Sequence, residues 1–180
     1  MSRLNAILEN TSDLVSAALP DARLTYLNRA GRRMAGWDQE ESLDGKVIAD
    51  LHPDWVMRKI ESEGLPSAAA LGSWEGETAI RHRDGREIPV SQVILSHRSA
   101  DGDLQYFSTI MRNIAERKHA QKKLAHSHDL MRYIIEHNRS AVAVHDRGMR
   151  YIYVSQRYLD EYNVKELAYK VHHALLDQGC

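Results

Sequence analysis

Two Asp-Gly pairs, Asp84-Gly85 and Asp101-Gly102, constrain the fold of this 180-residue chain more than any other feature. Each pair separates two apolar segments, and glycine accepts the positive φ that tight hairpin turns demand. The pairs therefore predict three successive antiparallel strands, over residues 74–83, 88–95 and 104–111. Each Asp-Gly pair is expected to form a two-residue turn.

Two shorter apolar segments precede these strands. Leu14–Ala18 and Arg23–Leu27 are joined by Pro20-Asp21, a turn pair that fits a hairpin. Residues 28–71 read as short helices. The expected fold class is therefore α+β, with a five-stranded antiparallel sheet and a helical cap on one face of it.

The helical segments carry recognisable end signals. Residues 1–12 predict a short amphipathic helix. Asn28 is placed to cap a helix that Gly36 ends. A longer helix that carries Trp55 is expected to stop before Gly64.

A long C-terminal helix is expected over residues 114–138, which are rich in Lys, Glu, Gln and Ala. Apolar residues fill about half of its heptad seam, whereas a stable coiled coil has a nearly complete seam. This helix is therefore expected to dimerise only with help from adjoining domains, and a homodimer is the expected assembly.

The chain then repeats its own beginning. Ala141–Val144 and Tyr151–Val154 mirror the first two strand segments, and Ser155–Asn163 mirrors the helix that Asn28 starts. Too few residues follow Val164 for three further strands, and a lone hairpin is marginal in water. This part is therefore expected to dock on a partner chain, to swap with one or to remain loosely ordered. The expected domains are an N-terminal helix (1–12), a complete domain (13–113), a helical linker (114–138) and a truncated second domain (139–180).

Composition excludes several classes of function. The formal net charge is −1, from 24 basic and 25 acidic residues, so no bulk field favours nucleic acid. No run approaches the roughly 18 apolar residues that a membrane helix needs. The one cysteine, Cys180, is the last residue, so no intrachain disulfide forms, and a reducing cytoplasm is the expected compartment.

The run from Phe107 to Lys118, an apolar strand that passes directly into a charged helix, resembles the closing strand and exit helix of a PAS domain with its C-terminal PAC-type motif. Other positions agree in order: Asn28, Gly45, Trp74-x-Gly76-Glu77, Asp84-Gly85 and Pro89-Val90. The resemblance implies a non-enzymatic sensory module, as in bacterial sensor histidine kinases and diguanylate cyclases. It implies signal relay through Arg112, Asn113 and Ile114 to an output domain or a partner signalling protein.

The same resemblance places alternate residues of three strands on the inner face of the sheet. Three of these residues, Thr78, Gln92 and Thr109, are polar. A buried polar group without a partner costs roughly 1–3 kcal/mol, so these residues imply water, mutual hydrogen bonds or a small polar ligand. The residues predicted to line a ligand pocket are Thr78, Gln92, Thr109, Ile94, Met111 and Trp55.

Cofactor signatures are sparse. Residues 28–71 contain no cysteine, which argues against a photoactive flavin site, and residues 54–71 contain no histidine, which argues against haem. A redox flavin leaves no sharp signature and stays open. No metal site is expected, because His126 and His128 lie two residues apart on a helix and do not face each other.

One enzymatic alternative comes from His126-Ser-His128-Asp129-Leu130, which superficially resembles the phosphoacceptor box of a histidine kinase. Such a box continues with Arg and then a nearby proline, whereas Met131-Arg132-Tyr133 follows here without one. A solvated linker is the favoured interpretation. Catalytic motifs such as Gly-x-Ser-x-Gly or a glycine-rich phosphate loop do not occur.

Overall fold

The computed structural model describes residues 3–163 and divides the chain into two compact units, with the boundary between Lys118 and His119. The predictions for residues 164–180, the end of the predicted second domain, lie outside the described residues.

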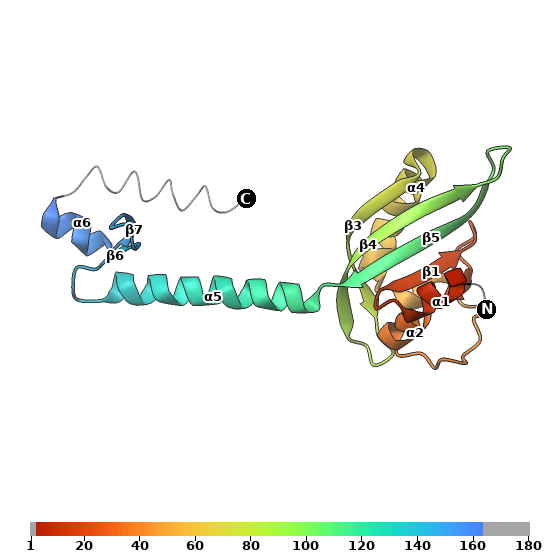
Figure 1. Ribbon diagram of the computed structural model, residues 1–180, viewed down its shortest axis with the longest axis horizontal. Helices are drawn as coiled ribbons and strands as arrows, with labels where there is room; N and C mark the ends of the chain where they lie inside the picture. Colours follow the sequence, from red (N-terminus) through yellow and green to blue (C-terminus); the bar gives the residue numbers. More distant parts are fainter. Residues whose placement is uncertain (1–2, 164–180) are drawn as a thin grey trace. The chain divides into compact units, whose positions relative to one another are not determined.

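The first unit is built on a five-stranded sheet (Figure 1). Its strands are β1 (Leu14–Ala18), β2 (Leu24–Leu27), β3 (Ser73–Arg81), β4 (Glu87–Arg98) and β5 (Leu104–Asn113). The spatial order is β2-β1-β5-β4-β3, and every neighbouring pair is antiparallel. The predicted α+β class is confirmed, and the last strand lies at the centre of the sheet.

One face of this sheet is covered by the helices between β2 and β3 (Figure 1). On β4, Val90, Gln92 and Ile94 alternate towards these helices and are buried. On the opposite face of β5, Tyr106 and Ile110 remain exposed. The alternation follows from the two-residue period of a strand, and it places the core between the sheet and its helical cap.

The cap consists of α2 (Arg29–Ala35), the short 3-10 turn η1 (Ile48–Leu51), α3 (Asp54–Lys59), the π-helical segment η2 (Ile60–Gly64) and α4 (Leu65–Leu71). As predicted, the Asn28 side chain caps α2 by accepting a hydrogen bond from the Gly31 N–H at 2.9 Å, and Gly36 ends it with a positive φ of 71°.

The predicted stop before Gly64 is wrong, because the chain stays helical to Leu71. The backbone widens to a π turn in which the Leu65 N–H donates to the Ile60 carbonyl. Pro66 then falls in the first turn of α4, where proline's fixed φ is compatible with a helix. The stop comes at Gly72, with φ 91°.

The two-residue turns expected at the Asp-Gly pairs are also corrected. Three residues, 83–85, lie between the paired residues His82 and Arg86, and the His82 N–H donates to the Arg86 carbonyl at 2.9 Å. Gly85 adopts the left-handed conformation with φ 89°. This is the three-residue hairpin loop, in which one left-handed residue follows a type I turn, and residues 100–102 form another.

The remaining elements are the N-terminal helix α1 (Arg3–Asn10), the long helix α5 (Ala115–His137), the strands β6 (Ala143–His145) and β7 (Tyr151–Val154), and the helix α6 (Gln156–Tyr162). In the second unit, β6 and β7 form a two-stranded antiparallel sheet. None of the helices between residues 3 and 163 is long and apolar enough to cross a bilayer.

Candidate functional site

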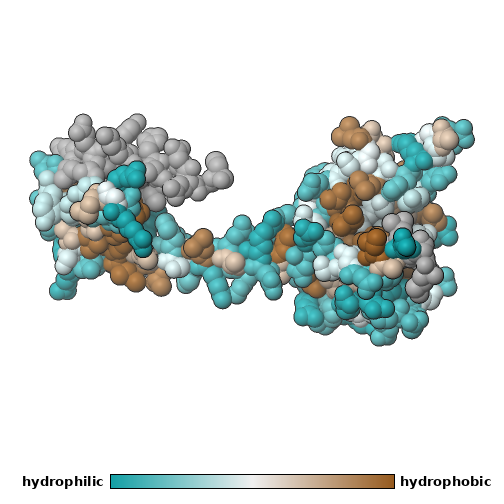
Figure 2. Space-filling model, viewed as in Figure 1, coloured by the Kyte–Doolittle hydropathy of each residue, from teal (hydrophilic) through white to brown (hydrophobic). Residues whose placement is uncertain are grey.

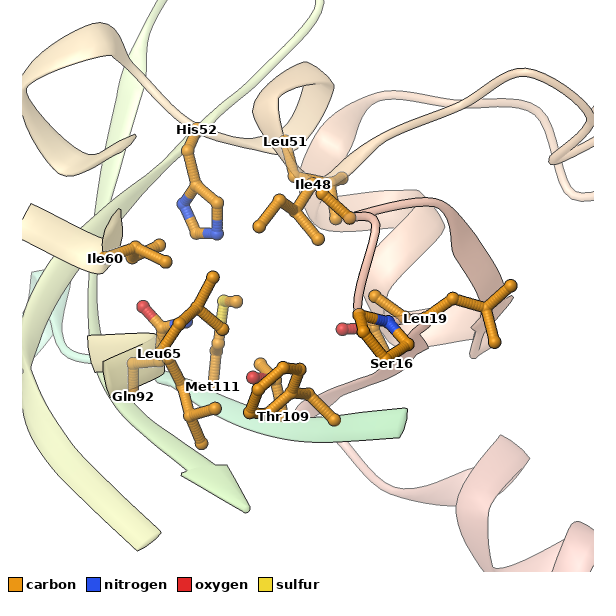
Figure 3. Close-up of a pocket in the computed structure, with 15 residues that line it drawn as sticks. Ser16, Leu19, Ile48, Leu51, His52, Ile60, Leu65, Gln92, Thr109 and Met111 are labelled. Carbon is orange, nitrogen blue, oxygen red and sulfur yellow. The ribbon is translucent and has the colours of Figure 1, made fainter. Parts of the chain in front are cut away.

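A small cavity lies between the sheet and its helical cap (Figure 3). Its volume is about 30 Å³. Most of the lining is apolar, and four polar side chains, Ser16, His52, Gln92 and Thr109, contribute to it. Figure 3 shows the His52 ring pointing from the cap into the cavity, opposite Gln92, Thr109 and Met111 from the sheet. The arrangement combines a hydrophobic enclosure with a few convergent polar groups, as small-molecule sites do.

A hydrogen bond from Thr78 fixes the orientation of the Gln92 side chain. The Thr78 hydroxyl donates to Gln92 Oε1 at 2.7 Å, and both residues are nearly fully buried. The pairing follows from the register of β3 against β4, which puts Gly76 opposite Gln92 and Thr78 opposite Val90. Because its carbonyl oxygen accepts from Thr78, the Gln92 amide keeps two N–H donors for the cavity.

His52 and Ser16 are the two polar lining residues that sequence reasoning missed, and His52 is the titratable one. Its Nδ1 lies 2.8 Å from the Ala79 carbonyl, which can only accept, so Nδ1 carries the proton and Nε2 is an acceptor. Burial of the ring lowers the pKa of His52 to about 4, so the ring is neutral at pH 7. The signal in the sequence was the position of this histidine. It follows the buried Leu51 and precedes Pro53, just before α3 begins.

The predicted pocket residues separate into three groups. Gln92, Thr109, Ile94 and Met111 line the cavity, and Thr78 supports Gln92 from outside the lining. The placement of Trp55 in the pocket is wrong. It is 44% exposed, and its indole Nε1 donates to Glu87 at 3.1 Å on the surface, because the inner face of α3 is taken by Val56.

The three residues predicted to relay a signal lie where β5 ends. The Arg112 guanidinium contacts the Asp13 carboxylate through two nitrogens, with the shortest distance 2.9 Å. Asp13 directly precedes β1, so this ion pair fastens the end of β5 to the start of β1. The hydrogen bonds to Asp13 raise the pKa of Arg112 above its ordinary value.

Asn113 and Ile114 form the start of α5. Asn113 Oδ1 accepts from the Ala115 N–H at 2.8 Å and so occupies one of the free donors at the helix N-terminus. Ile114 is 5% exposed, and its N–H donates to the Pro89 carbonyl of β4 at 3.0 Å. Together they hold the first residues of the helix against the sheet.

A second carboxylate, Glu77 of β3, holds the first turn of α5. It pairs with Arg117 at 2.8 Å and with Lys118 at 2.7 Å. The hydrogen bond from Lys118 lowers the pKa of Glu77. Glu77 is the last residue of the Trp74-x-Gly76-Glu77 motif. This motif therefore contacts the exit helix α5 through its carboxylate.

The cavity is much smaller than a site for flavin or haem. Pockets for drug-sized ligands span about 300–1,000 Å³, far more than the space here. A flavin or a haem therefore does not fit the cavity. Between residues 3 and 163, no group of three or more His, Cys, Asp or Glu side chains is placed to hold a metal ion. His126 and His128 are both exposed on α5.

The fold and its cavity define the class of small α+β domains that enclose a space between an antiparallel sheet and a helical cap. A family model described as PAS fold matches residues 8–119. The chain therefore belongs to the PAS fold family.

Solved structures agree on the fold. A PAS domain of a protein from Colwellia psychrerythraea is 18% identical, with a TM-score of 0.59, covering 63% of this chain and 96% of that chain. A sensory box histidine kinase/response regulator from Burkholderia thailandensis is 14% identical, with a TM-score of 0.56, covering 73% and 99%. The PAS domain of an HTR-like protein from Haloarcula marismortui is 23% identical, with a TM-score of 0.52, covering 62% and 89%. No curated protein gives a significant match.

Proposed function

We propose that the chain is a signal-transduction module in which a small polar ligand in the cavity changes the position of β5 and thereby moves α5. The observation that carries the proposal is that β5 contributes residues both to the cavity and to its junction with α5. Thr109 and Met111 of β5 line the cavity, and Arg112 and Asn113 follow directly at the exit junction.

The physical route is short. A ligand that contacts Thr109 pushes on or draws in β5, whose backbone is paired on both sides, to β1 and to β4. The displacement is therefore passed along the strand to the Arg112–Asp13 ion pair. Because Asn113 caps α5 and Glu77 holds its first turn, a shift there changes the direction or register of the helix. The solved structure from Burkholderia thailandensis is named as a sensory box histidine kinase/response regulator, which is consistent with such a role.

The proposal is tested with Arg112→Ala/Asn113→Ala in the full chain. A ligand identified by mass spectrometry of the natively purified protein is added, and hydrogen exchange of the first turns of α5 is followed. The wild-type chain is expected to change its exchange there on binding. The double variant should bind equally well but show no change in α5. Arg33→Ala, at an exposed position of α2, is the control. An equal response of α5 in the double variant rules out the relay.

We further propose that residues 130–163 form the start of a second PAS domain. The support is a set of hydrogen bonds that recurs with a constant spacing of 127 residues. In the first unit, Asn28 Oδ1 accepts from the N–H groups of Val15 and Gly31, at 3.0 and 2.9 Å. In the second unit, Ser155 Oγ accepts from the N–H groups of Val142 and Tyr158, at 3.0 and 3.3 Å.

A carboxylate contact recurs with the same spacing. Glu9 of α1 accepts from the Tyr26 hydroxyl at 2.7 Å and from the Arg29 N–H at 3.0 Å. Glu136 accepts from the Tyr153 hydroxyl, and from the Gln156 N–H at 3.3 Å. The last turns of α5 thus contact the second hairpin in the same way as α1 contacts the first hairpin.

A homodimer is part of the proposal. On the sheet face opposite the cap, apolar side chains gather over the strands in Figure 2. Tyr106 and Ile110 of β5 are exposed on this face. Leu124 and Met131 of α5 are also exposed. Burying such groups against a second copy stabilises a dimer. Sedimentation equilibrium of the chain, compared with Ile110→Glu, measures this contribution; an unchanged molecular mass in the variant argues against the sheet face.

A further inference from the structure

The cavity has no charged side chain in its lining. Of the fifteen lining residues, none is Asp, Glu, Lys or Arg, and the titratable one, His52, is neutral at pH 7. An ion that entered would lose its water shell without a counter-charge, which costs several kcal/mol. The lining therefore discriminates against anions and cations alike.

The polar groups of the lining also differ in whether they donate or accept a hydrogen bond. His52 Nε2 accepts a hydrogen bond, because Nδ1–H is engaged by the Ala79 carbonyl. Gln92 Nε2 donates, because Oε1 accepts from Thr78. Both side chains are 2% exposed, so their orientations are fixed by packing. A molecule that satisfies both must carry one donor and one acceptor.

Size gives the third restriction. A volume of 30 Å³ corresponds to space for about two to three water molecules. A molecule of about four non-hydrogen atoms replaces two to three waters and so matches this space with small side-chain adjustments.

We propose that the cavity selects an uncharged molecule of about four non-hydrogen atoms that donates a hydrogen bond to His52 Nε2 and accepts one from Gln92 Nε2. A small primary amide has this pattern. The inference rests on the proposed sensory function and deepens it by naming the class of ligand.

Three probes of nearly equal shape test the inference: acetamide, acetate and acetamidinium, which are neutral, anionic and cationic. Each is titrated into the full ¹⁵N-labelled chain at pH 7 while the ring nitrogens of His52 and the side-chain amide of Gln92 are followed by NMR. Acetamide is expected to give a saturable shift of both groups, and each ion is expected to bind at least about tenfold more weakly, a difference of about 1.4 kcal/mol.

Gln92→Met keeps the length of the side chain but removes its donors, and acetamide should bind this variant about tenfold more weakly. Gln105→Met, at an exposed position of β5, is the matched control and should bind as the wild-type chain does. If Gln92→Met does not fold, Thr78→Val, which removes the hydroxyl that donates to Gln92 Oε1, is the second variant and should likewise weaken acetamide binding.

Equal or tighter binding of acetate or acetamidinium would overturn the inference, as would the absence of a saturable shift with any probe. These failures are distinct from failure of the signalling role. Acetate that binds and changes hydrogen exchange in α5 would overturn the ligand class alone. Acetamide that binds without any change in α5 would support the ligand class and overturn the relay.

Discussion

At the scale of the residue, His52 couples the stability of the fold to its protonation. The ring is 2% exposed and hydrogen-bonded to the Ala79 carbonyl, and burial lowers its pKa from 6.5 to about 4. The positive charge of Arg81 acts in the same direction. In the unfolded chain the ring takes up a proton near pH 6.5. Between these two pKa values the unfolded state therefore binds more protons than the folded state does.

Stability should consequently rise with pH through this window. The contribution of His52 is fully present above about pH 6.5 and is lost as pH falls towards 4, by about 3 kcal/mol in total. In His52→Gln this pH dependence should be absent, although the variant is less stable at pH 7. Urea unfolding at half-unit steps from pH 7.5 to 4 measures the difference. Parallel curves for the two proteins would refute this role of His52.

The residues of the site differ in how far the sequence could predict them. Gln92, Ile94 and Met111 follow from strand alternation, because inward positions repeat every second residue. Thr78 was placed on the correct face, but whether it reaches the cavity depends on the register between β3 and β4, which a single strand does not encode. His52 lies in a connection between helical segments, where no periodicity shows which side chains face inward. Trp55 was misplaced because the rotation of a short helix about its axis is set by its packing.

At the scale of the element, α2 lies close against the first hairpin at Gly31. Gly31 is buried on α2, and a Cβ added to it would meet Leu27 Cδ1 and would lie 2.9 Å from Leu14 Cγ. The absent side chain thus lets the helix lie directly on the strands. In the second unit the position 127 residues later is Tyr158, so α6 does not approach its hairpin in the same way.

Gly31→Ala should therefore destabilise the first unit although alanine is the better helix former. The gain in helix propensity is about 1 kcal/mol, and overpacking costs about 1–3 kcal/mol, so a net loss of up to about 2 kcal/mol is expected. Arg33→Ala on the exposed side of the same helix should cost nothing comparable. Thermal unfolding of both variants provides the comparison, and a Gly31→Ala variant as stable as the wild-type chain would show that Leu27 can move aside.

The boundaries of elements were predicted less well than their existence. Gly64 and Pro66 together normally end a helix, yet the π turn at Ile60–Gly64 carries the chain past both. The wide turn depends on packing, since Ile60 and Gly64 are both buried. The Asp-Gly pairs located the hairpins correctly, but the length of each loop was fixed by the pairing of the residues that flank it, as at His82 and Arg86.

At the scale of the whole molecule, the same carboxylate contact occurs once in each unit. Glu9 and Glu136 both join a helix to the second strand of a hairpin and to the start of the helix that follows. The environment of the tyrosine is also repeated: burial, with a further contribution from the glutamate, raises the pKa of Tyr26 and of Tyr153 to about 12. The sequence repeat was visible in the strands, whereas the glutamates lie in helices where a single Glu carries no signal.

The repeat makes each glutamate a control for the other. Glu136→Ala removes an acceptor from the Tyr153 hydroxyl and from the Gln156 N–H, so the second hairpin and α6 should open more readily. For a partly exposed charged acceptor, a loss of about 1 kcal/mol is expected, or roughly fivefold faster hydrogen exchange over residues 151–162. Glu9→Ala should have the corresponding effect on residues 24–35 and none on the second unit. If Glu136→Ala leaves exchange over 151–162 unchanged while Glu9→Ala accelerates it over 24–35, then the recurring contact stabilises the first unit alone, and the second hairpin is held by other interactions.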